Sequence, residues 1–345
     1  MDAASSITAE IFSCAACGKE EGEDNKLESC TACNMAKYCN SYNCGIVHFR
    51  RHHEEWCRKR ASEILTEAYA AHIEALFTQP PPNEDCPICL ITLPPVGEQT
   101  YQSCCGKMIC DGCIDAHNDT YRKHFLASHT RSESDTEEEE YYPKCPFCRK
   151  RASQSVEEEI ERLQERSDMK DTNAMYNLGK CYERGDCVPR DVNKAIELWT
   201  EATELGNVHA SALLADAYNP YVQRVVEGVP KDMNKVFHYY EIAAKGGCSM
   251  ARANLGVLEE DRGNMEASRK HFMISAAQGN DNALMKVKKG YMYGHMTKDD
   301  FATALRAHKR AQDEMKSEHR TKSATSEDRC GCLRCKVNAA NVFNY

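Results

Sequence analysis

The sequence contains no apolar run of about 18 residues, the length that a membrane-spanning helix needs. Its first residues, Met1–Glu10, lack the basic start and the apolar core of a secretory signal peptide. Positive charge is not in excess either, because 44 Lys and Arg residues stand against 53 Asp and Glu residues, for a net charge of −9. The basic stretch at 48–60 is interrupted by Glu54 and Glu55. We therefore expect an intracellular protein, cytoplasmic or nuclear, with neither membranes nor nucleic acid among its partners.

Cysteine, by contrast, is abundant: 15 of the 21 cysteines lie in the first 148 residues. Pairs with the C-x-x-C spacing are Cys14/Cys17, Cys30/Cys33, Cys86/Cys89, Cys110/Cys113 and Cys145/Cys148. A C-x-x-C turn delivers two thiolates to one tetrahedral zinc ion. Because we find no signal for export to an oxidising compartment, the pairs predict zinc ligands and not disulfides.

The first set of predicted ligands lies within residues 14–57. Its members are Cys14, Cys17, Cys30, Cys33, Cys39, Cys44, one histidine and Cys57. Eight ligands suffice for two closed structural zinc sites with no open position for catalysis. The spacing from Cys44 favours His52 as the histidine, whereas the spacing to Cys57 favours His53. We predict His53.

This segment resembles the MYND zinc finger, whose signature includes a Tyr-Cys step, here Tyr38-Cys39, and a final His-x-x-x-Cys, here ending at Cys57. One departure is that four residues separate Cys39 from Cys44, where the family usually has three. The resemblance implies two interleaved sites, one made by Cys14, Cys17, Cys39 and Cys44 and the other by Cys30, Cys33, His53 and Cys57. It also implies binding of short, often proline-containing peptides of partner proteins.

A second set of eight thiols lies within residues 83–150, namely Cys86, Cys89, Cys104, Cys105, Cys110, Cys113, Cys145 and Cys148. Their order and spacing resemble a RING finger, in the all-cysteine variant that carries a Cys-Cys-Gly step. The resemblance implies a cross-brace of two zinc ions, one held by Cys86, Cys89, Cys110 and Cys113 and the other by Cys104, Cys105, Cys145 and Cys148. Lys107 stands where the usual RING has a histidine, and a protonated lysine cannot ligate zinc. The alternative is that Cys104 or Cys105 is spare and a distant group completes the site.

The RING resemblance implies a ubiquitin ligase with no covalent intermediate on the chain itself. Such a finger orients a ubiquitin-conjugating enzyme and its thioester-linked ubiquitin. Ile88 lies between the first two ligands and Pro146 between the last two, at the positions that form an apolar docking groove in active family members. Arg149 follows the last ligand, where many active RING fingers have a cation that hydrogen-bonds both the conjugating enzyme and ubiquitin. The expected partners are therefore a ubiquitin-conjugating enzyme and ubiquitin, together with target or adaptor proteins.

Two features favour a different class of protein, a non-enzymatic zinc-stabilised scaffold for protein–protein interactions. His117 stands where many active RING fingers have a tryptophan on the wall of the groove. The segment between Cys113 and Cys145 is long and includes an acidic insertion at 131–142, whose composition predicts disorder. The sequence leaves both the ligase and the scaffold open.

The second half of the chain repeats itself. The motif Ala-x-x-x-Leu followed by Gly or Ala begins at Ala174, recurs 36 residues later at Ala210 and again 41 residues later at Ala251. A loop with a Val-Pro step follows the first two copies, at 185–191 and 228–232. Repeats of this length predict a solenoid of helix pairs. The pattern resembles the Sel-like repeats, relatives of the tetratricopeptide repeat, which bind proteins and have no chemistry of their own.

The predicted fold class is α-rich and multidomain, with two small zinc-stabilised cross-brace fingers followed by an α/α solenoid of short helical repeats. The tail carries Cys330, Cys332 and Cys335, for which no fourth ligand lies nearby. The predicted domains are a disordered N-terminus (1–13), the MYND-type finger (14–57), a helical linker (58–82), the RING-type finger (83–150), a linker helix (151–170), the Sel-like repeats (171–316) and a disordered tail (317–345).

The intact chain is expected to carry about four zinc ions, because the two sets of eight ligands make four tetrahedral sites. Elemental analysis of the purified protein measures this number directly. Removal of the metal should unfold the fingers, since a structural zinc ion contributes roughly 10 kcal/mol to folding, while the helical signal of the repeats persists. A content of two ions would show that one of the two modules binds no zinc.

Overall fold

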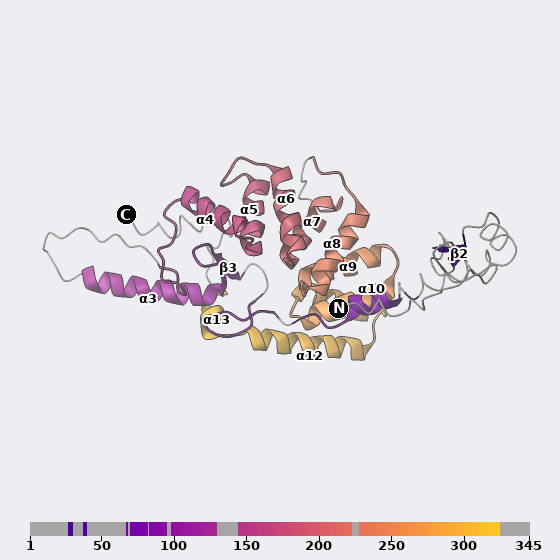
Figure 1. Cartoon of the computed structure of the whole chain (residues 1–345). Coiled ribbons are helices and arrows are strands. Elements are labelled where there is room, and N and C mark those ends of the chain that lie inside the picture. Colours follow the sequence, from indigo (N-terminus) through magenta and orange to yellow (C-terminus); the bar gives the residue numbers. More distant parts are fainter. Residues whose placement is uncertain are drawn as a thin grey trace. The chain divides into compact units, whose positions relative to one another are not determined.

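The computed structural model describes residues 27–29, 37–39, 67, 70–81, 83–94, 98–129, 144–222 and 228–324 (Figure 1). The chain divides into two compact units, the first ending at Leu76 and the second beginning at Phe77. In the first unit, strand β1 (Leu27–Ser29) pairs antiparallel with β2 (Lys37–Cys39). The predicted helical linker contains helical residues at 67 and 70–77, which end before Pro80, a residue that cannot continue a helix.

Most predicted ligands of the MYND-type finger lie outside the described residues. Cys39 ends strand β2, opposite Leu27. The predicted disordered N-terminus (1–13), the acidic insertion (131–142) and the tail cysteines also fall outside the described part of the chain. The predicted MYND-type ligands that lie outside the described residues are Cys14, Cys17, Cys30, Cys33, Cys44, His53 with its alternative His52, and Cys57.

The second unit begins with what we call the cysteine-rich module, residues 83–150. Strand β3 (Gln99–Gln102) and strand β4 (Lys107–Cys110) form an antiparallel hairpin that leads directly into helix α3 (Asp111–His129). The small core of the module consists of Leu93 and Ile109 together with the buried thiols of Cys86, Cys110 and Cys113. Because a core with this few apolar side chains does not stabilise a fold by itself, the module needs an additional constraint such as a metal ion.

A series of helices follows, arranged as a solenoid in which consecutive helices pack antiparallel (Figure 1). None of the described helices is both long and apolar enough to cross a membrane. In chain order the helices are α4 (Val156–Asp168), α5 (Thr172–Arg184), α6 (Val192–Glu204), α7 (Val208–Tyr218), α8 (Met233–Lys245), α9 (Ser249–Asp261), α10 (Met265–Ala277), α11 (Asp281–Met292), α12 (Lys298–Met315) and α13 (Glu318–Ala324).

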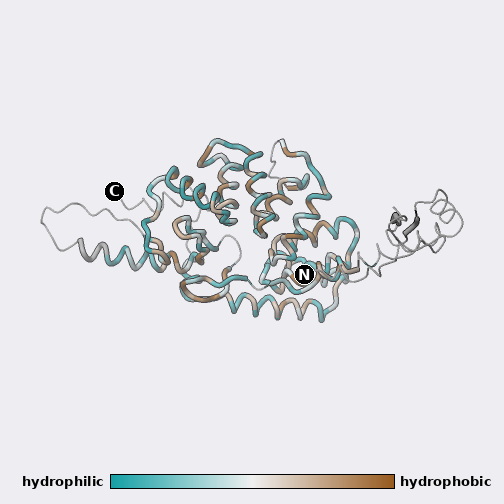
Figure 2. The backbone as a smooth tube through the Cα atoms, in the orientation of Figure 1, coloured by the Kyte–Doolittle hydropathy of each residue, from teal (hydrophilic) through white to brown (hydrophobic). Residues whose placement is uncertain are grey.

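Short polar side chains set where the helices begin. Asp171, Asp191, Asn207, Asp232 and Asn280 each precede a helix and accept hydrogen bonds from backbone N–H groups of its first turn. Such caps satisfy donors that have no partner within the helix. Hydrophobic residues recur along each helix between hydrophilic ones, as Figure 2 shows, and the buried ones join the helices into a core. The predicted α-rich fold class with its helical solenoid is confirmed.

Small residues let the paired helices approach closely. Trp199 of α6 is buried against Gly179 of α5, and its indole N–H donates to the backbone carbonyl of Tyr176 at 3.2 Å. Phe272 of α10 lies against Gly256 of α9 in the same way. A Cβ atom added to Gly179 would lie 2.3 Å from the indole nitrogen of Trp199, so glycine is required there by contact and not by backbone conformation.

Replacement of Gly179 by alanine is expected to destabilise the second unit by about 1–3 kcal/mol, the usual cost of overpacking a core. The matched control is Gly290→Ala in α11, where the new methyl group would meet the flexible side chain of Met296 at 3.1 Å. The control should change stability by less than about 1 kcal/mol. Urea denaturation of the full chain, followed by far-UV circular dichroism, distinguishes the two variants. Equal stability of both would show that the Trp199 contact is not close-packed.

Candidate metal centres

The first C-x-x-C loop is a tight turn around the sulfur of Cys86. The N–H of Cys86 donates to the carbonyl of Ile91 at 2.9 Å, and the N–H of Leu90 donates back to the carbonyl of Cys86 at 2.9 Å. Leu90 has a φ of 56°, a left-handed conformation that is uncommon for a residue other than glycine. An isolated bridge between Asp85 and Thr92 closes the base of the loop.

The last C-x-x-C loop repeats this geometry. The N–H of Cys145 donates to the carbonyl of Lys150 at 2.8 Å, and the N–H of Arg149 donates to the carbonyl of Cys145 at 3.0 Å. Arg149 has a φ of 64°, and a bridge between Lys144 and Arg151 closes the base. The two loops share the sequence Cys-Pro-x-Cys and adopt the same turn, with a left-handed residue directly after the second cysteine.

The eight thiols of the module gather in two groups, within each of which all sulfur atoms lie within 4.8 Å of one another. Sulfur–sulfur distances are 3.9 Å for Cys89 and Cys110, 3.9 Å for Cys105 and Cys145, and 3.4 Å for Cys104 and Cys148. The first group consists of Cys86, Cys89, Cys110 and Cys113, and the second of Cys104, Cys105, Cys145 and Cys148.

These distances fit a tetrahedral metal ion better than disulfides. Four thiolates at 2.3 Å from one zinc ion lie about 3.8 Å apart, whereas a disulfide requires about 2.05 Å. Each of the eight is a free cysteine in the described part of the chain. The structure thus brings together the two sets that the RING resemblance implies. Cys104 and Cys105 both belong to the second group, so no distant residue is needed to complete it.

The first cysteine of each tight turn is held in a position that favours its thiolate. At Cys145, a hydrogen bond from the thiol of Cys104 and the backbone N–H groups of Phe147 and Cys148 outweigh burial and lower the pKa. At Cys86, burial raises the pKa, but the backbone N–H groups that point at its sulfur outweigh it and lower the pKa below the ordinary value. Because the thiolate is the form that binds metal, the backbone donors favour Cys86 and Cys145 as ligands. Burial raises the pKa of Cys105 and Cys113, so a bound ion would have to drive the deprotonation of these thiols.

The adjacent thiols of Cys104 and Cys105 are placed by the turn between β3 and β4. The N–H groups of Cys105 and Gly106 both donate to the carbonyl of Gln102, at 3.1 and 2.7 Å. Gly106 has a φ of 72°, and a Cβ atom there would lie 2.5 Å from the guanidinium of Arg166. The glycine of the Cys-Cys-Gly step therefore serves both the turn and the close approach of helix α4.

The predicted docking residues lie within the two tight turns. Ile88 is 40% exposed, Arg149 is exposed and Pro146 is half-buried. Phe147 is 45% exposed, and the ammonium group of Lys107 lies at a distance of 5.8 Å from the centroid of its ring. Apolar and cationic surface is therefore available next to both groups of thiols.

Sequence reasoning missed Arg320, because it lies in the segment predicted to be a disordered tail. The prediction of disorder is wrong for residues 318–324, which form helix α13 and pack against α3 (Figure 1). The guanidinium of Arg320 donates to the carbonyls of Thr92 and Ile91, at 2.7 and 3.0 Å, and to the sulfur of Cys89 at 3.5 Å. Only a glycine at position 112 admits α13 so closely, since a Cβ atom there would lie 2.6 Å from the backbone nitrogen of Arg320.

Helices α4 and α5 hold the opposite side of the module. The hydroxyl of Tyr101 donates to Asp171 at 2.7 Å, and Arg166 donates to the same carboxylate at 3.0 Å and to the carbonyl of Ser103 at 2.6 Å. Burial, together with the Asp171 carboxylate, raises the pKa of Tyr101 far above its ordinary value, so its hydroxyl stays a donor. Tyr101 also packs against Leu163, which adds an apolar contact to this joint.

The model of the Sel1 repeat family matches the chain at residues 172–207 and 224–248, over α5, α6 and α8. Sel1 repeats therefore occur at α5, α6 and α8, as the resemblance to Sel-like repeats predicted. Among curated proteins, none matches this chain.

Several solved structures show similarity to the chain. A protective antigen of uropathogenic Escherichia coli with an SLR fold is 23% identical, with a TM-score of 0.40, and the match covers 48% of this chain but only 37% of the antigen. A Sel1 repeat protein from Oxalobacter formigenes is 27% identical, with a TM-score of 0.34, covering 38% of this chain and 97% of that protein. An immunity protein from Pseudomonas aeruginosa is 16% identical, with a TM-score of 0.26, covering 57% and 80%.

Arg320→Ala is expected to weaken metal binding at the first group of thiols by roughly 10- to 100-fold, the usual effect of losing a group that orients a ligand. Release of zinc from the full chain to a colorimetric chelator measures this effect. In the variant, one ion per chain should become labile before the others. His319→Ala, an exposed neighbour on the same helix, should release zinc like the parent chain. Identical release curves for all three proteins would show that Arg320 does not support the site.

Proposed function

We propose that the chain is a RING-type ubiquitin ligase whose cysteine-rich module holds a ubiquitin-conjugating enzyme and whose repeats hold the target protein. The observation that carries the proposal is the alternation of thiol pairs between the two groups. The first and third pairs along the chain form one group, and the second and fourth form the other. This interleaving is the cross-brace expected of a RING finger.

Zinc, when bound, supplies structure and no bond chemistry in this proposal. Four thiolates fill a tetrahedral ion, so neither group has an open position for water or substrate. The work falls to the surface beside the ligands: Ile88 and Pro146 offer apolar area to the conjugating enzyme, and Arg149 offers a planar set of donors to enzyme and ubiquitin. Catalysis of this kind acts by orientation of a reactive thioester.

The remaining parts of the chain provide for the target. The Sel1 repeats bind target or adaptor proteins, and the MYND-type finger at 14–57, which carries two further zinc ions in this proposal, adds a second binding site. Because Asp171, Arg166 and Arg320 attach the cysteine-rich module to both ends of the repeat array, a bound target would be held at a fixed distance from the conjugating enzyme.

A specific observation favours the second candidate, a zinc-stabilised scaffold that does not act on ubiquitin. His117 occupies the position of the groove tryptophan, is half-buried and stacks on Tyr121 with ring centroids 6.3 Å apart. An imidazole presents less apolar area than an indole, which weakens a docking groove.

The ligase proposal predicts that Ile88→Ala and Arg149→Ala fail at different steps. Ile88→Ala should weaken binding of the conjugating enzyme by about 1–3 kcal/mol, since it removes apolar contact area. Arg149→Ala should leave that binding nearly intact and slow the discharge of ubiquitin, because its bonds form only when ubiquitin is held against the module. Binding is measured by calorimetry, and discharge is followed with a panel of thioester-charged conjugating enzymes.

Lys150→Ala is the matched control for Arg149→Ala, since it removes a neighbouring exposed cation. The control should discharge ubiquitin like the parent chain, and all variants should retain their zinc. If the parent chain promotes no discharge with any enzyme of the panel, the ligase proposal is wrong and the scaffold stands.

A further inference from the structure

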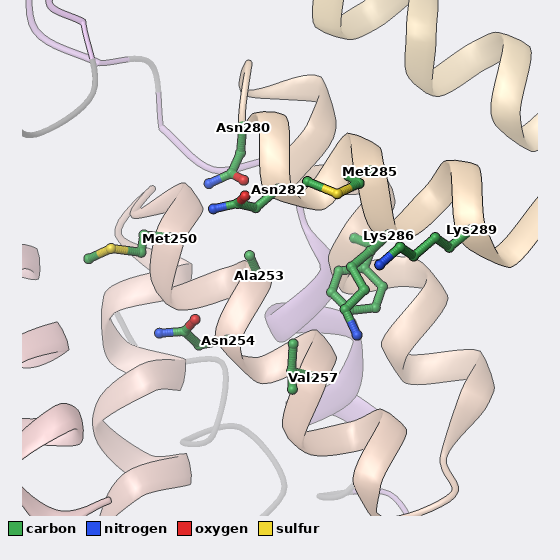
Figure 3. Close-up of a pocket in the computed structure, with 10 residues that line it drawn as sticks. Met250, Ala253, Asn254, Val257, Asn280, Asn282, Met285, Lys286 and Lys289 are labelled. Carbon is green, nitrogen blue, oxygen red and sulfur yellow. The ribbon is translucent and has the colours of Figure 1, made fainter. Parts of the chain in front are cut away.

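A pocket of ≈ 310 Å³ opens between helices α9 and α11 of the repeat array. Its floor is apolar and is formed by Ala253 and Val257 of α9 and Phe272 of α10. Two methionines stand at its edges, Met250 at 47% exposure and Met285 at 50%. Figure 3 shows α9 and α11 facing each other across the pocket with polar side chains above and beside the floor.

One floor position of the pocket varies in size among the repeats, since it holds tyrosine in the first and alanine in the second (Ala212) and third (Ala253). Counted from the helix caps, Ala253 of α9 corresponds to Tyr176 of α5, since each is the fifth residue after its cap. In the first repeat, the ring of Tyr176 lies across the groove against His209 of α7, with ring centroids 6.1 Å apart. Alanine leaves that space open between α9 and α11.

The polar lining consists of amides and cations. Asn280 and Asn282 lie on one side of the pocket and Lys286 and Lys289 on another (Figure 3). The amide nitrogen of Asn254 already donates to the hydroxyl of Tyr240 at 3.0 Å. No carboxylate belongs to the described lining, although the chain as a whole has a net charge of −9. Lys289 is exposed and has no side-chain partner among the described residues, which leaves an uncompensated positive charge at the pocket.

Two further contacts show which donors are already in use. Lys286 pairs with Glu260 at 2.7 Å, so it contributes less free charge than Lys289. The carbonyl oxygen of Asn280 caps α11, which leaves its amide nitrogen for a ligand. By comparison, the equivalent Asn207 uses its amide nitrogen to donate to Asn173 of the preceding repeat at 3.1 Å. The α9–α11 pocket thus offers donors that the corresponding position of an earlier repeat consumes.

We propose that this pocket binds a peptide segment of a partner protein in which a carboxylate side chain lies next to an apolar one. The apolar side chain would occupy the floor, and the carboxylate would accept hydrogen bonds from Lys289 and from the amide groups of Asn280 and Asn282. The proposal rests only on the part of the proposed function that assigns partner binding to the repeats, and it does not depend on ubiquitin transfer.

The test screens the full zinc-loaded chain against a displayed library of random octapeptides. Bound peptides should be enriched in Asp or Glu beside Leu, Ile, Met or Phe. Binding of the most enriched peptide, measured by fluorescence anisotropy, should weaken at least tenfold with Lys289→Glu and stay unchanged with Lys288→Glu. Lys288 is the matched control, because it is exposed on the same helix and does not line the pocket.

A second variant, Ala253→Tyr, introduces the residue that fills the groove of the first repeat and should abolish peptide binding while the thermal unfolding midpoint is kept. Selection of peptides without acidic residues, no selection at all, or an equal loss with both lysine variants would overturn the proposal. Ubiquitin discharge by Lys289→Glu and peptide binding by Ile88→Ala should both match the parent chain. This outcome separates failure of the pocket from failure of the ligase proposal.

Discussion

The carboxylate of Asp171 is the contact on which the arrangement of the second unit depends. It caps the first helix of the repeats, accepts the hydroxyl of Tyr101 from the cysteine-rich module and pairs with Arg166. Both oxygens are therefore engaged, and the side chain of Asp171 is only 18% exposed. Hydrogen bonds to a charged group in such surroundings are stronger than those between neutral groups. The first repeat and the cysteine-rich module are consequently joined through the side chain of Asp171 and are not separate domains on a flexible linker.

This joint gives the metal centres a role beyond their own module. The hairpin that presents Tyr101 also presents Cys104 and Cys105, so the ion that orders these thiols would also order the surface that meets α4 and α5. At the other side, Arg320 connects α13 to the loop that carries Cys89. Metal binding and repeat packing are thus linked through backbone carbonyls and a few charged side chains, and they are not independent properties of two domains.

Local signals in the sequence were enough to predict the solenoid and the thiol pairs of the cysteine-rich module, and the resemblance to a RING finger implied how the pairs divide into two groups. The spacing of Ala, Gly and aromatic residues determines helix packing directly, as Gly179 and Trp199 show, and a C-x-x-C turn places two sulfurs without help from distant residues. Arg320 could not be predicted, because its partners lie 228 and 229 residues away and no periodic pattern marks it. The α9–α11 pocket was equally invisible, since it depends on how α9, α10 and α11 pack together and no sequence motif marks its lining. The sequence alone therefore did not reveal the features that depend on residues distant in sequence coming together, namely the hydrogen bonds of Arg320 and the α9–α11 pocket.

The two-sided attachment of the module also bears on how this repeat array can evolve. In an open solenoid each unit contacts only its neighbours, so units can be gained or lost at little cost. Here α4 and α5 hold the module beside Gly106, while α13, at the opposite end of the array, holds it beside Gly112. Insertion or deletion of one helix pair would carry α13 away from its contact with α3 and Cys89. The two-sided attachment therefore constrains the number of helix pairs between α4 and α13, whereas changes in loops and surface positions leave both contacts in place.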